Sequence, residues 1–400
     1  MITLTLFDTT ESRLNLMPLT LTRPVADLRV GIFTLAEKWQ HRFGAKVGYI
    51  TKGYLQALYP LPTTETHLLV DGRVIANNEL WEALIALKPG QKLVQELEII
   101  GANLDTPPAQ LEDLNNALLH LEPVYFEGKV QFVCYPWDIF GLNAQEIKAD
   151  FELLPKLYTN IGVNDAHTKT YNDSQIFVAP GAKIRAAILN AEDGPIFIGP
   201  DAEVQEGSAI KGPFALCEHA VVNMGAKMRG DTTVGPYSKV AGEISNSVIW
   251  GYSNKGHDGF MGNTVIGQWC NLGADTNTSN LKNNYSNVKI YNYGKGQQVD
   301  TGKQFCGLIM GDHSKAGINT MFNTGTVVGV GVNVYGGGFP DKFISSYSWG
   351  GPDSEYTRYR FADFLKTAKA VMGRRGIEVS ADYEKMLRYL SDAEDIKSLA

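Results

Sequence analysis

The sequence is poor in cysteine and has no long apolar run, and both absences narrow the class of protein. Its 400 residues include four cysteines, Cys134, Cys217, Cys270 and Cys306, which are far apart and form no CxxC pair. That spacing supports neither a disulfide framework nor a zinc site, so we expect four reduced thiols. The N-terminal stretch shows no basic leader followed by an apolar segment. We therefore expect a cytoplasmic protein with no membrane partner.

An excess of positive charge is also missing. Lys and Arg number 36 against 43 Asp and Glu, giving a formal net charge of −7 with acids and bases interleaved. Binding to nucleic acid needs a concentrated Lys/Arg surface, so we expect small-molecule partners and no nucleic acid. The composition, 44% hydrophobic and 20% charged, is typical of a folded globular chain. A length of 400 residues predicts two or three domains.

A six-residue repeat dominates the middle of the chain. From Ile198 an aliphatic residue or methionine occupies every sixth position: Ile198, Val204, Ile210, Leu216, Val222, Met228, Val234 and Val240. This period fits neither an α-helix nor simple strand alternation. It fits a triangular coil in which three short strands form each rung and turn their aliphatic side chains inward. We predict a left-handed parallel β-helix of hexapeptide repeats over residues 170–344.

The regions around this repeat show other patterns. Residues 280–305 are polar and interrupt the repeat, which resumes from Met310, so we expect a protruding loop there. Residues 1–160 alternate strand-like and helical patterns, which predicts a Rossmann-like α/β domain. Within it, Leu28, Ile32, Leu35, Trp39 and Phe43 lie on one face of a predicted helix. Helical spacing over residues 345–400 predicts a short helical C-terminal segment.

His257 is the candidate for chemistry in the coil. It lies between Gly256 and Gly259, where we expect the regular coil to be interrupted. A break that projects a histidine beside Asn271 and Asn280 would make a concave, polar site on an otherwise flat wall. Acyl transfer to an amine requires loss of a proton from the attacking nitrogen, and an imidazole, which titrates near neutral pH, can take it. The alternative is a turn histidine without a role.

The segment GYSNKGHDGFMGNTVIGQWCNLGADTNTSN resembles the acetyltransferase segment of the GlmU family, the bifunctional glucosamine-1-phosphate N-acetyltransferases and N-acetylglucosamine-1-phosphate uridyltransferases. The resemblance implies that His257 is the general base, that Asn271 and Asn280 hold the amino sugar, and that Arg229 contacts the sugar phosphate. It also implies acetyl-CoA as the co-substrate and a homotrimer that binds CoA between neighbouring coils.

The sequence departs from the family pattern at two tyrosines. Phe260 and Leu281 stand at these positions, which leaves the identity of the acceptor open. Tyr285 or Lys282, in the inserted polar stretch, is a candidate to replace a lost substrate contact.

The resemblance extends more faintly to the N-terminal region, where it implies a sugar-1-phosphate nucleotidyltransferase domain acting on a nucleoside triphosphate. The glycine-rich GxGTR loop of that family is missing, since no glycine precedes Gly31. Backbone approaches a triphosphate closely only where side chains are absent. Arg13 and Arg23 are candidates to bind phosphate instead. Asp71, in LLVDGRVI, resembles the carboxylate that holds Mg²⁺ in such enzymes.

The sequence therefore predicts an acetyl-CoA-dependent N-acetyltransferase of an amino-sugar phosphate, fused to a nucleotidyltransferase-like domain, in UDP-N-acetylglucosamine biosynthesis for the cell envelope. Two alternatives remain open. One is a non-catalytic protein that binds a sugar nucleotide and oligomerises through its repeats. The other is a nucleotidyltransferase of different base specificity, for example thymidylyl transfer.

Overall fold

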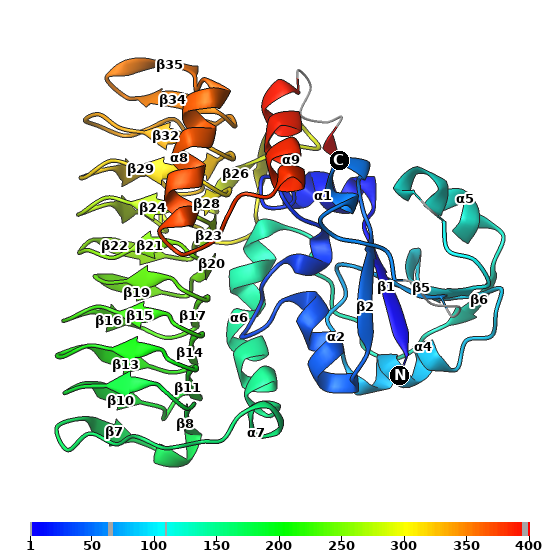
Figure 1. Ribbon diagram of the computed structural model, residues 1–400, viewed down its shortest axis with the longest axis horizontal. Coiled ribbons are helices and arrows are strands. Elements are labelled where there is room, and N and C mark those ends of the chain that lie inside the picture. The colour runs from blue at the N-terminus through cyan, green and yellow to red at the C-terminus, as the bar shows by residue number, and fades with distance from the viewer. Residues whose placement is uncertain (1, 63–66, 109, 394–398) are drawn as a thin grey trace. The chain divides into compact units, whose positions relative to one another are not determined.

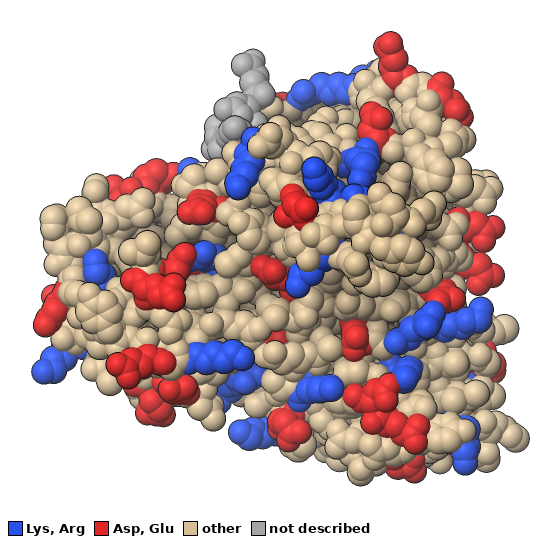
Figure 2. All heavy atoms as spheres, turned by 180° about the vertical axis from the view of Figure 1, so that it is seen from behind, with Lys and Arg blue, Asp and Glu red and all other residues tan. Residues whose placement is uncertain are grey.

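A computed structural model describes residues 2–62, 67–108, 110–393 and 399–400. The chain forms two compact units (Figure 1). The N-terminal unit consists of Met1–Leu28, Phe33–Tyr135 and Ser380–Ala400, and the coil unit consists of Arg29–Ile32 and Pro136–Val379. The face shown in Figure 2 carries acidic and basic side chains close together, as their interleaving in the sequence suggests.

A six-stranded sheet in the order β2-β1-β3-β5-β4-β6 forms the centre of the N-terminal unit, with β1 parallel to both β2 and β3. β1 is buried along its whole length, as expected for the central strand of an α/β domain. The strands are β1 (Thr3–Phe7), β2 (Lys46–Ile50), β3 (His67–Asp71), β4 (Gln91–Gln95), β5 (Glu98–Leu104) and β6 (Glu122–Tyr125). The helices are α1 (Thr10–Leu16), α2 (Leu35–Phe43), α3 (Gly53–Gln56), α4 (Asn78–Ile85), α5 (Leu114–Leu119) and α9 (Ala381–Asp392), with short 3₁₀ turns at Val25–Asp27 and Leu111–Asp113.

The predicted helix beginning near Leu28 is shorter than its apolar pattern suggests. α2 begins only at Leu35, because Thr34 and Glu37 form a reciprocal capping box at its N-terminus. Leu28 and Ile32 are nevertheless buried. The apolar pattern therefore predicted their burial correctly, but the helix that it predicted is too long. α9 packs against α3 in the same unit, and the ring of Tyr389 stacks on that of Tyr54 at 4.9 Å.

The predicted coil is confirmed as a parallel β-solenoid with three walls. The first wall contains β7 (Lys169–Tyr171), β10 (Ile188–Asn190), β13 (Ala209–Lys211), β16 (Lys227–Met228), β19 (Glu243–Ser245), β22 (Phe260–Gly262), β25 (Asn277–Thr278) and β30 (Met321–Phe322). The second contains β8 (Ile176–Val178), β11 (Ile196–Ile198), β14 (Phe214–Leu216), β17 (Thr232–Val234), β20 (Val248–Gly251), β23 (Val265–Gln268), β28 (Ile309–Met310), β31 (Val327–Val328) and β33 (Phe343–Ile344). The third contains β9 (Lys183–Ile184), β12 (Glu203–Val204), β15 (Val221–Val222), β18 (Lys239–Val240), β21 (Asn254–Lys255), β24 (Asn271–Leu272), β29 (Lys315–Ala316), β32 (Asn333–Val334), β34 (Ser348–Gly351) and β35 (Ser354–Arg358).

The eight residues of the six-residue repeat are at most 2% exposed and form one continuous core. Parallel pairing brings equivalent positions into register, for example Val204 beside Val222 and Val222 beside Val240. Each inward side chain therefore packs on the one in the next rung, which is how a solenoid builds a core from short strands.

Two features of the predicted coil need correction. The coil is not interrupted at His257, because pairing continues through Asn254–Asn271 and Met261–Thr278. The insertion predicted at residues 280–305 does follow β25, but its central part is not an irregular loop. β26 (Lys289–Asn292) and β27 (Gln297–Asp300) form an antiparallel hairpin whose Tyr291 ring stacks on Phe343 at 3.7 Å. The hairpin packs back on the coil because it has its own buried side chains, including Ile290.

Three helices complete the coil unit: α6 (Pro136–Phe151), α7 (Leu154–Leu157) and α8 (Phe361–Gly373). α6 packs along the second wall, where its Asn143 side chain accepts a hydrogen bond from Thr233 Oγ1 at 3.1 Å. α8 is fastened by Phe364, whose ring packs edge-on against His313 and Tyr347. Across the part of the chain that the structure describes, no helix has the length and apolar character needed to cross a membrane.

Candidate functional site

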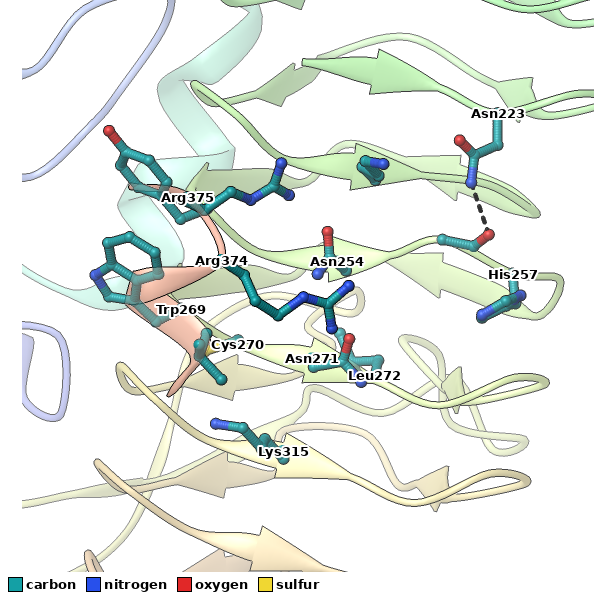
Figure 3. A pocket seen from close by; sticks show the side chains of 14 residues that line it. Asn223, Asn254, His257, Trp269, Cys270, Asn271, Leu272, Lys315, Arg374 and Arg375 are labelled. Atoms are coloured by element: carbon teal, nitrogen blue, oxygen red, sulfur yellow. Dashed lines mark hydrogen bonds between the residues drawn. The ribbon is translucent and has the colours of Figure 1, made fainter. Parts of the chain in front are cut away.

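A cavity of about 560 Å³ lies on the third wall of the coil, beside the C-terminal end of α8 (Figure 3). Its lining includes His257, the outward side chains of β18, β21, β24 and β29, and two arginines that follow α8. Figure 3 shows Arg374 and Arg375 extending from the end of the helix across these strands. The cavity is thus built by one unit of the chain, between a coil wall and a docked helix.

His257 lies on the turn that joins β21 to β22, and the sequence explains the shape of this turn. Gly259 has φ +118°, and a Cβ there would collide with the carbonyl oxygen of Thr276 in the next rung. Asn223, two rungs earlier, holds the turn by donating from Nδ2 to the Gly256 carbonyl at 2.9 Å. The His257 side chain is exposed and also lines a neighbouring cavity of about 580 Å³ with Asp258. A histidine so placed can meet a ligand from either side of its turn.

Lys255 is a functional candidate that the sequence analysis missed. It pairs with Val240 in an inward position of the third wall and is 1% exposed. Its Nζ donates to the carbonyl oxygens of His257 at 2.5 Å and Asp258 at 2.6 Å. Burial lowers the pKa of Lys255 to about 8, against the opposing effect of the Asp258 and Asp275 carboxylates. A lysine inside the coil thereby ties down the turn that carries His257.

The floor of the cavity is polar and its rim is cationic. Asn254 and Asn271 are paired across β21 and β24, and Lys315 follows in the next rung. Burial lowers the pKa of Lys315, whose Nζ donates to the His313 carbonyl at 3.0 Å. Cys270 also lines the cavity, but burial raises its thiol pKa to about 12, so it is no nucleophile near neutral pH. The chemistry available is therefore a base, amide groups and cations.

An aromatic ladder runs along the coil corner beside the cavity. The rings of Tyr237, Tyr252 and Trp269 stack at 5.0 and 4.2 Å, and His313 continues the row. All four residues have φ between 55° and 62°, a left-handed conformation that is costly for bulky side chains. Stacking from rung to rung holds them there. His313, at the end of this ladder, is only 2% exposed and packs against Phe364.

The coil residues predicted to form one site are only partly brought together. His257 and Asn271 line the same cavity. Arg229 lies on the first wall, is exposed and pairs with Glu243 at 2.9 Å. Asn280 donates to Asn263 Oδ1 at 2.8 Å, and Lys282 donates to the Asn287 carbonyl at 2.6 Å within the inserted segment. None of these last three lines the His257 cavity, so within one chain they are separate from it.

Arg13, a predicted phosphate ligand, is fully buried in the N-terminal unit. Its Nη1 donates to Asp8 Oδ2 at 2.9 Å, and its Nη2 donates to the Thr20 carbonyl and the Tyr54 hydroxyl, each at 2.7 Å. Asp8 in turn accepts from the Val25 amide at 2.8 Å. Arg13 therefore ties the segment after β1 to the rest of the fold, and its prediction as a phosphate ligand gains no support. Arg23 is likewise 3% exposed and pairs with Asp27 at 3.3 Å.

Asp71, the predicted magnesium ligand, is engaged by Arg73. Oδ1 accepts from Arg73 Nε at 3.1 Å and Oδ2 accepts from Nη2 at 2.7 Å, and Oδ1 also accepts from the Arg73 amide. Burial raises the pKa of Asp71, and these hydrogen bonds oppose the shift. Among the residues that the structure describes, no cluster of three or more His, Cys, Asp or Glu could hold a metal. Because both of its oxygens are held by Arg73, Asp71 as arranged does not fit Mg²⁺.

Comparisons with known proteins place one family model on the N-terminal part of the chain and find relatives of two activities. Residues 4–157 match the family model described as sugar nucleotidyl transferase. The bifunctional sugar-1-phosphate nucleotidylyltransferase/acetyltransferase of Sulfurisphaera tokodaii is 29% identical over 162 residues, which is 39% of this chain and 40% of that protein. The bifunctional protein GlmU of Methanococcus vannielii is 27% identical over 218 residues, or 54% and 45%. The chain thus spans less than half the length of these curated relatives.

A solved structure, the polySia-specific acetyltransferase NeuO, matches with a TM-score of 0.29 and 15% identity, covering 53% of this chain and 96% of NeuO. A score this low carries no weight for function. The sequence matches do confirm the resemblance indicated by the GHDGF and NLGAD segments. Residues 4–157 match the sugar nucleotidyl transferase family model, and parts of the chain are similar to bifunctional nucleotidyltransferase/acetyltransferase proteins of the GlmU type.

Proposed function

We propose that the coil unit is an acyl-CoA-dependent N-acyltransferase that acetylates an amino-sugar phosphate such as glucosamine 1-phosphate. The observation that carries the proposal is the placement of His257 at the edge of a polar, cation-lined cavity beside Asn271. The names of the bifunctional relatives support the reaction class. In this proposal the product enters UDP-N-acetylglucosamine synthesis.

In the proposed step the acyl group passes from CoA to the acceptor amine. The amine nitrogen of the acceptor attacks the thioester carbonyl carbon, the new C–N bond forms and the C–S bond breaks. His257 takes the proton that the nitrogen loses and passes it to the departing thiolate. Asn271, exposed on the floor, offers both an amide donor and an amide acceptor for sugar hydroxyls. Asn223 and Lys255 act on the turn and not on the substrate, and so are positioning residues.

Arg229, Asn280 and Lys282 belong to this site only when a second copy of the chain supplies them. The proposal therefore includes a homotrimer in which neighbouring coils share each site. This arrangement would let residues that are separated within one chain contact one amino-sugar phosphate.

The test is the release of free CoA thiol from acetyl-CoA with glucosamine 1-phosphate as the acceptor. His257→Ala is expected to lower kcat by about 10²- to 10⁴-fold, the usual contribution of a general base. His219→Ala is the matched control, since His219 is an exposed coil histidine that does not line the cavity. Equal rates for wild type and His257→Ala would remove His257 from the mechanism.

For the N-terminal unit we propose binding of a sugar nucleotide, because residues 4–157 match the family model. The alternative is catalytic turnover. It would not use Arg13 and Asp71 as they are arranged, because both are engaged within the protein. Pyrophosphate release from UTP and dTTP with sugar 1-phosphates separates the two. Release with either nucleotide would establish transfer and its base specificity, whereas binding of UDP-sugar without release would support the binding role.

A further inference from the structure

The turn that carries His257 differs from other turns at the same corner of the coil. This corner joins the third wall to the first, and most of its turns contain four residues. In three of the others the third residue donates its N–H to a carbonyl of the rung before: Gly207 to Ala186 at 2.9 Å, Gly225 to Glu206 at 3.0 Å and Asn319 to Ala274 at 2.8 Å. An ordinary turn at this corner is therefore bound by its backbone to the rung before it.

The N–H groups of Asp258 and Gly259 make no such bond. Among the residues that the structure describes, neither N–H has an acceptor within the protein. The turn before it is two residues shorter, consisting of Ala241 and Gly242, and the Gly242 carbonyl already accepts from the Lys227 amide. The register of the ordinary turns is lost at this point, which leaves two donors on the turn of the proposed base.

Lys255 binds the carbonyl ends of the same two peptide groups. Its Nζ donates to the His257 carbonyl at 2.5 Å and to the Asp258 carbonyl at 2.6 Å, from an inward position that is 1% exposed. The His257 carbonyl and the Asp258 N–H belong to one planar trans peptide, and the Asp258 carbonyl and the Gly259 N–H belong to the next. C=O and N–H point in opposite directions in a trans peptide. Both N–H groups therefore point away from the ammonium.

The charge of Lys255 acts on both peptide groups. A hydrogen bond from an ammonium draws electron density toward the carbonyl oxygen, so the N–H of the same peptide becomes a stronger donor. The titratable groups whose charges act on Lys255 are Asp258 and Asp275, and both carboxylates are exposed. Solvent screens exposed charges more than it screens the buried ammonium. The two N–H groups therefore favour a negatively charged partner.

These donors lie beside the proposed base and at a cavity. Gly256, His257 and Asp258 all line the cavity of about 580 Å³. Acyl transfer to an amine needs both a base and donors, because the nitrogen loses a proton while the thioester oxygen gains negative charge. Asn223 binds the Gly256 carbonyl at the start of the turn and Lys255 binds its middle, so the donors are fixed before a substrate arrives.

We propose that the N–H groups of Asp258 and Gly259 bind the thioester oxygen while it is negatively charged, and that Lys255 is a positioning residue whose ammonium polarises both peptide groups. When the acceptor amine attacks, the π electrons of the thioester carbonyl move onto this oxygen. They return as the C–S bond breaks and the thiolate leaves. The charge exists only between these two events, so the interaction lowers the barrier and does not strengthen substrate binding. The inference rests on the proposed acyl transfer and adds the donors that stabilise its intermediate.

The test compares steady-state acetyl transfer by the full chain in wild type, Lys255→Met and Lys255→Gln. Both variants remove the charge, but the Gln amide can still donate to the carbonyls of the turn. We expect kcat to fall about ten- to a hundredfold in both, with KM for glucosamine 1-phosphate and for acetyl-CoA unchanged. Lys183→Met, which removes an exposed lysine at an outward position of the coil, is the matched control and should keep the wild-type kcat. Recovery of kcat in Lys255→Gln would show that Lys255 only holds the turn, and would overturn the inference.

The pH dependence of the wild-type rate is a second readout, and it needs no variant that folds. Burial lowers the pKa of Lys255 to about 8, so the ammonium loses its proton as the pH rises through this value. A general base alone gives a rate that rises with pH and then levels off. Wild-type kcat should instead fall above about pH 8, and this fall should be absent in Lys255→Gln.

The outcomes separate this inference from the proposed function. No alkaline fall in wild type, or the same fall in Lys255→Gln, would overturn the inference. If His257→Ala abolishes transfer while both Lys255 variants keep the wild-type kcat, the proposed function stands and the inference is wrong. A wild-type protein that acetylates no amino-sugar phosphate would refute the proposed function, and the inference with it.

Discussion

The two units place their cations in opposite ways. In the coil unit Arg374 and Arg375 project over a polar wall and line an open cavity. In the N-terminal unit Arg13 is fully buried and Arg73 is turned onto Asp71, so both guanidinium groups end on protein acceptors. A cation that lines a cavity is available to a ligand, whereas one engaged by carboxylates and carbonyls holds the fold together.

The contrast matters because Arg13 and Arg73 both lie close to strand ends where a ligand is expected. Asp8 follows β1 and Asp71 ends β3, and these parallel neighbours form the carboxyl edge of the sheet. Ligands of open α/β sheets usually bind at that edge. The departure from a glycine-rich loop after β1 thus coincides with a buried ion pair in its place.

The largest expected effect comes from removing the buried ion pair. Arg13→Met should destabilise the N-terminal unit by about 3–5 kcal/mol, because the buried Asp8 carboxylate loses its charged partner. Hydrogen exchange of the β1 and β2 amides would measure it, with exposed Lys46→Met as the control. Unchanged protection in Arg13→Met would break the distinction between the two kinds of cation.

Lys255 tests the comparison from inside the coil, since it is a buried cation that serves a functional turn. Its folded pKa of about 8 lies below the ordinary 10.5, so the unfolded chain holds the proton more tightly. Stability of wild type relative to Lys255→Met should therefore rise between pH 8 and pH 10.5, by at most about 3 kcal/mol. Denaturant unfolding across this range would show it.

The control for this experiment is Lys239→Met, which removes a lysine from the preceding rung that faces outward and is exposed. Its stability difference from wild type should not change over the same pH range. A flat profile for Lys255→Met as well would mean that the buried amine keeps its proton up to about pH 10.5, so that burial does not lower its pKa.

Replacing Arg73 is expected to have a smaller effect on stability, and adding magnesium tests the arrangement of Asp71. Arg73→Met should lower the stability of the N-terminal unit by about 1–3 kcal/mol, because a buried carboxylate loses its donors. Magnesium itself should not raise the melting temperature of wild type. A rise that disappears in Asp71→Asn would show that the ion displaces Arg73, and would restore a metal-dependent role for this edge.

The repeat was predictable because its cause is local and periodic. An inward position in a triangular coil recurs every six residues, so Ile198 through Val240 could be assigned as core from spacing alone. Lys255 is an exception to this rule, because it is a lysine at an inward position just before a Gly-His turn. This exception could be recognised only once the register was known, because the repeat shortens after Val240, where Ile244 is the next inward residue.

The rest of the site depends on contacts distant in sequence. Nothing in the helical pattern of α8 shows that Phe364 packs on His313 or that Arg374 reaches the wall near Asn271. The polar composition of the 280–305 insertion likewise did not predict its hairpin, because the apolar residues there are few and interrupted by glycine. Helix formation follows from local spacing, whereas docking is set by tertiary packing.

Arg229→Gln is expected to change stability least, and it also tests the proposed trimer most directly. Arg229→Gln removes an exposed ion pair with Glu243 and should alter the free energy of unfolding by less than about 1 kcal/mol. In the proposed trimer, however, this guanidinium contacts the sugar phosphate of a neighbouring site, so KM for glucosamine 1-phosphate should rise about tenfold. Arg185→Gln, which removes another exposed coil arginine paired with Glu203, serves as the control. An unchanged KM would place Arg229 with the surface ion pairs and leave the acceptor's phosphate to the cations around His257, so that one chain would hold the whole site.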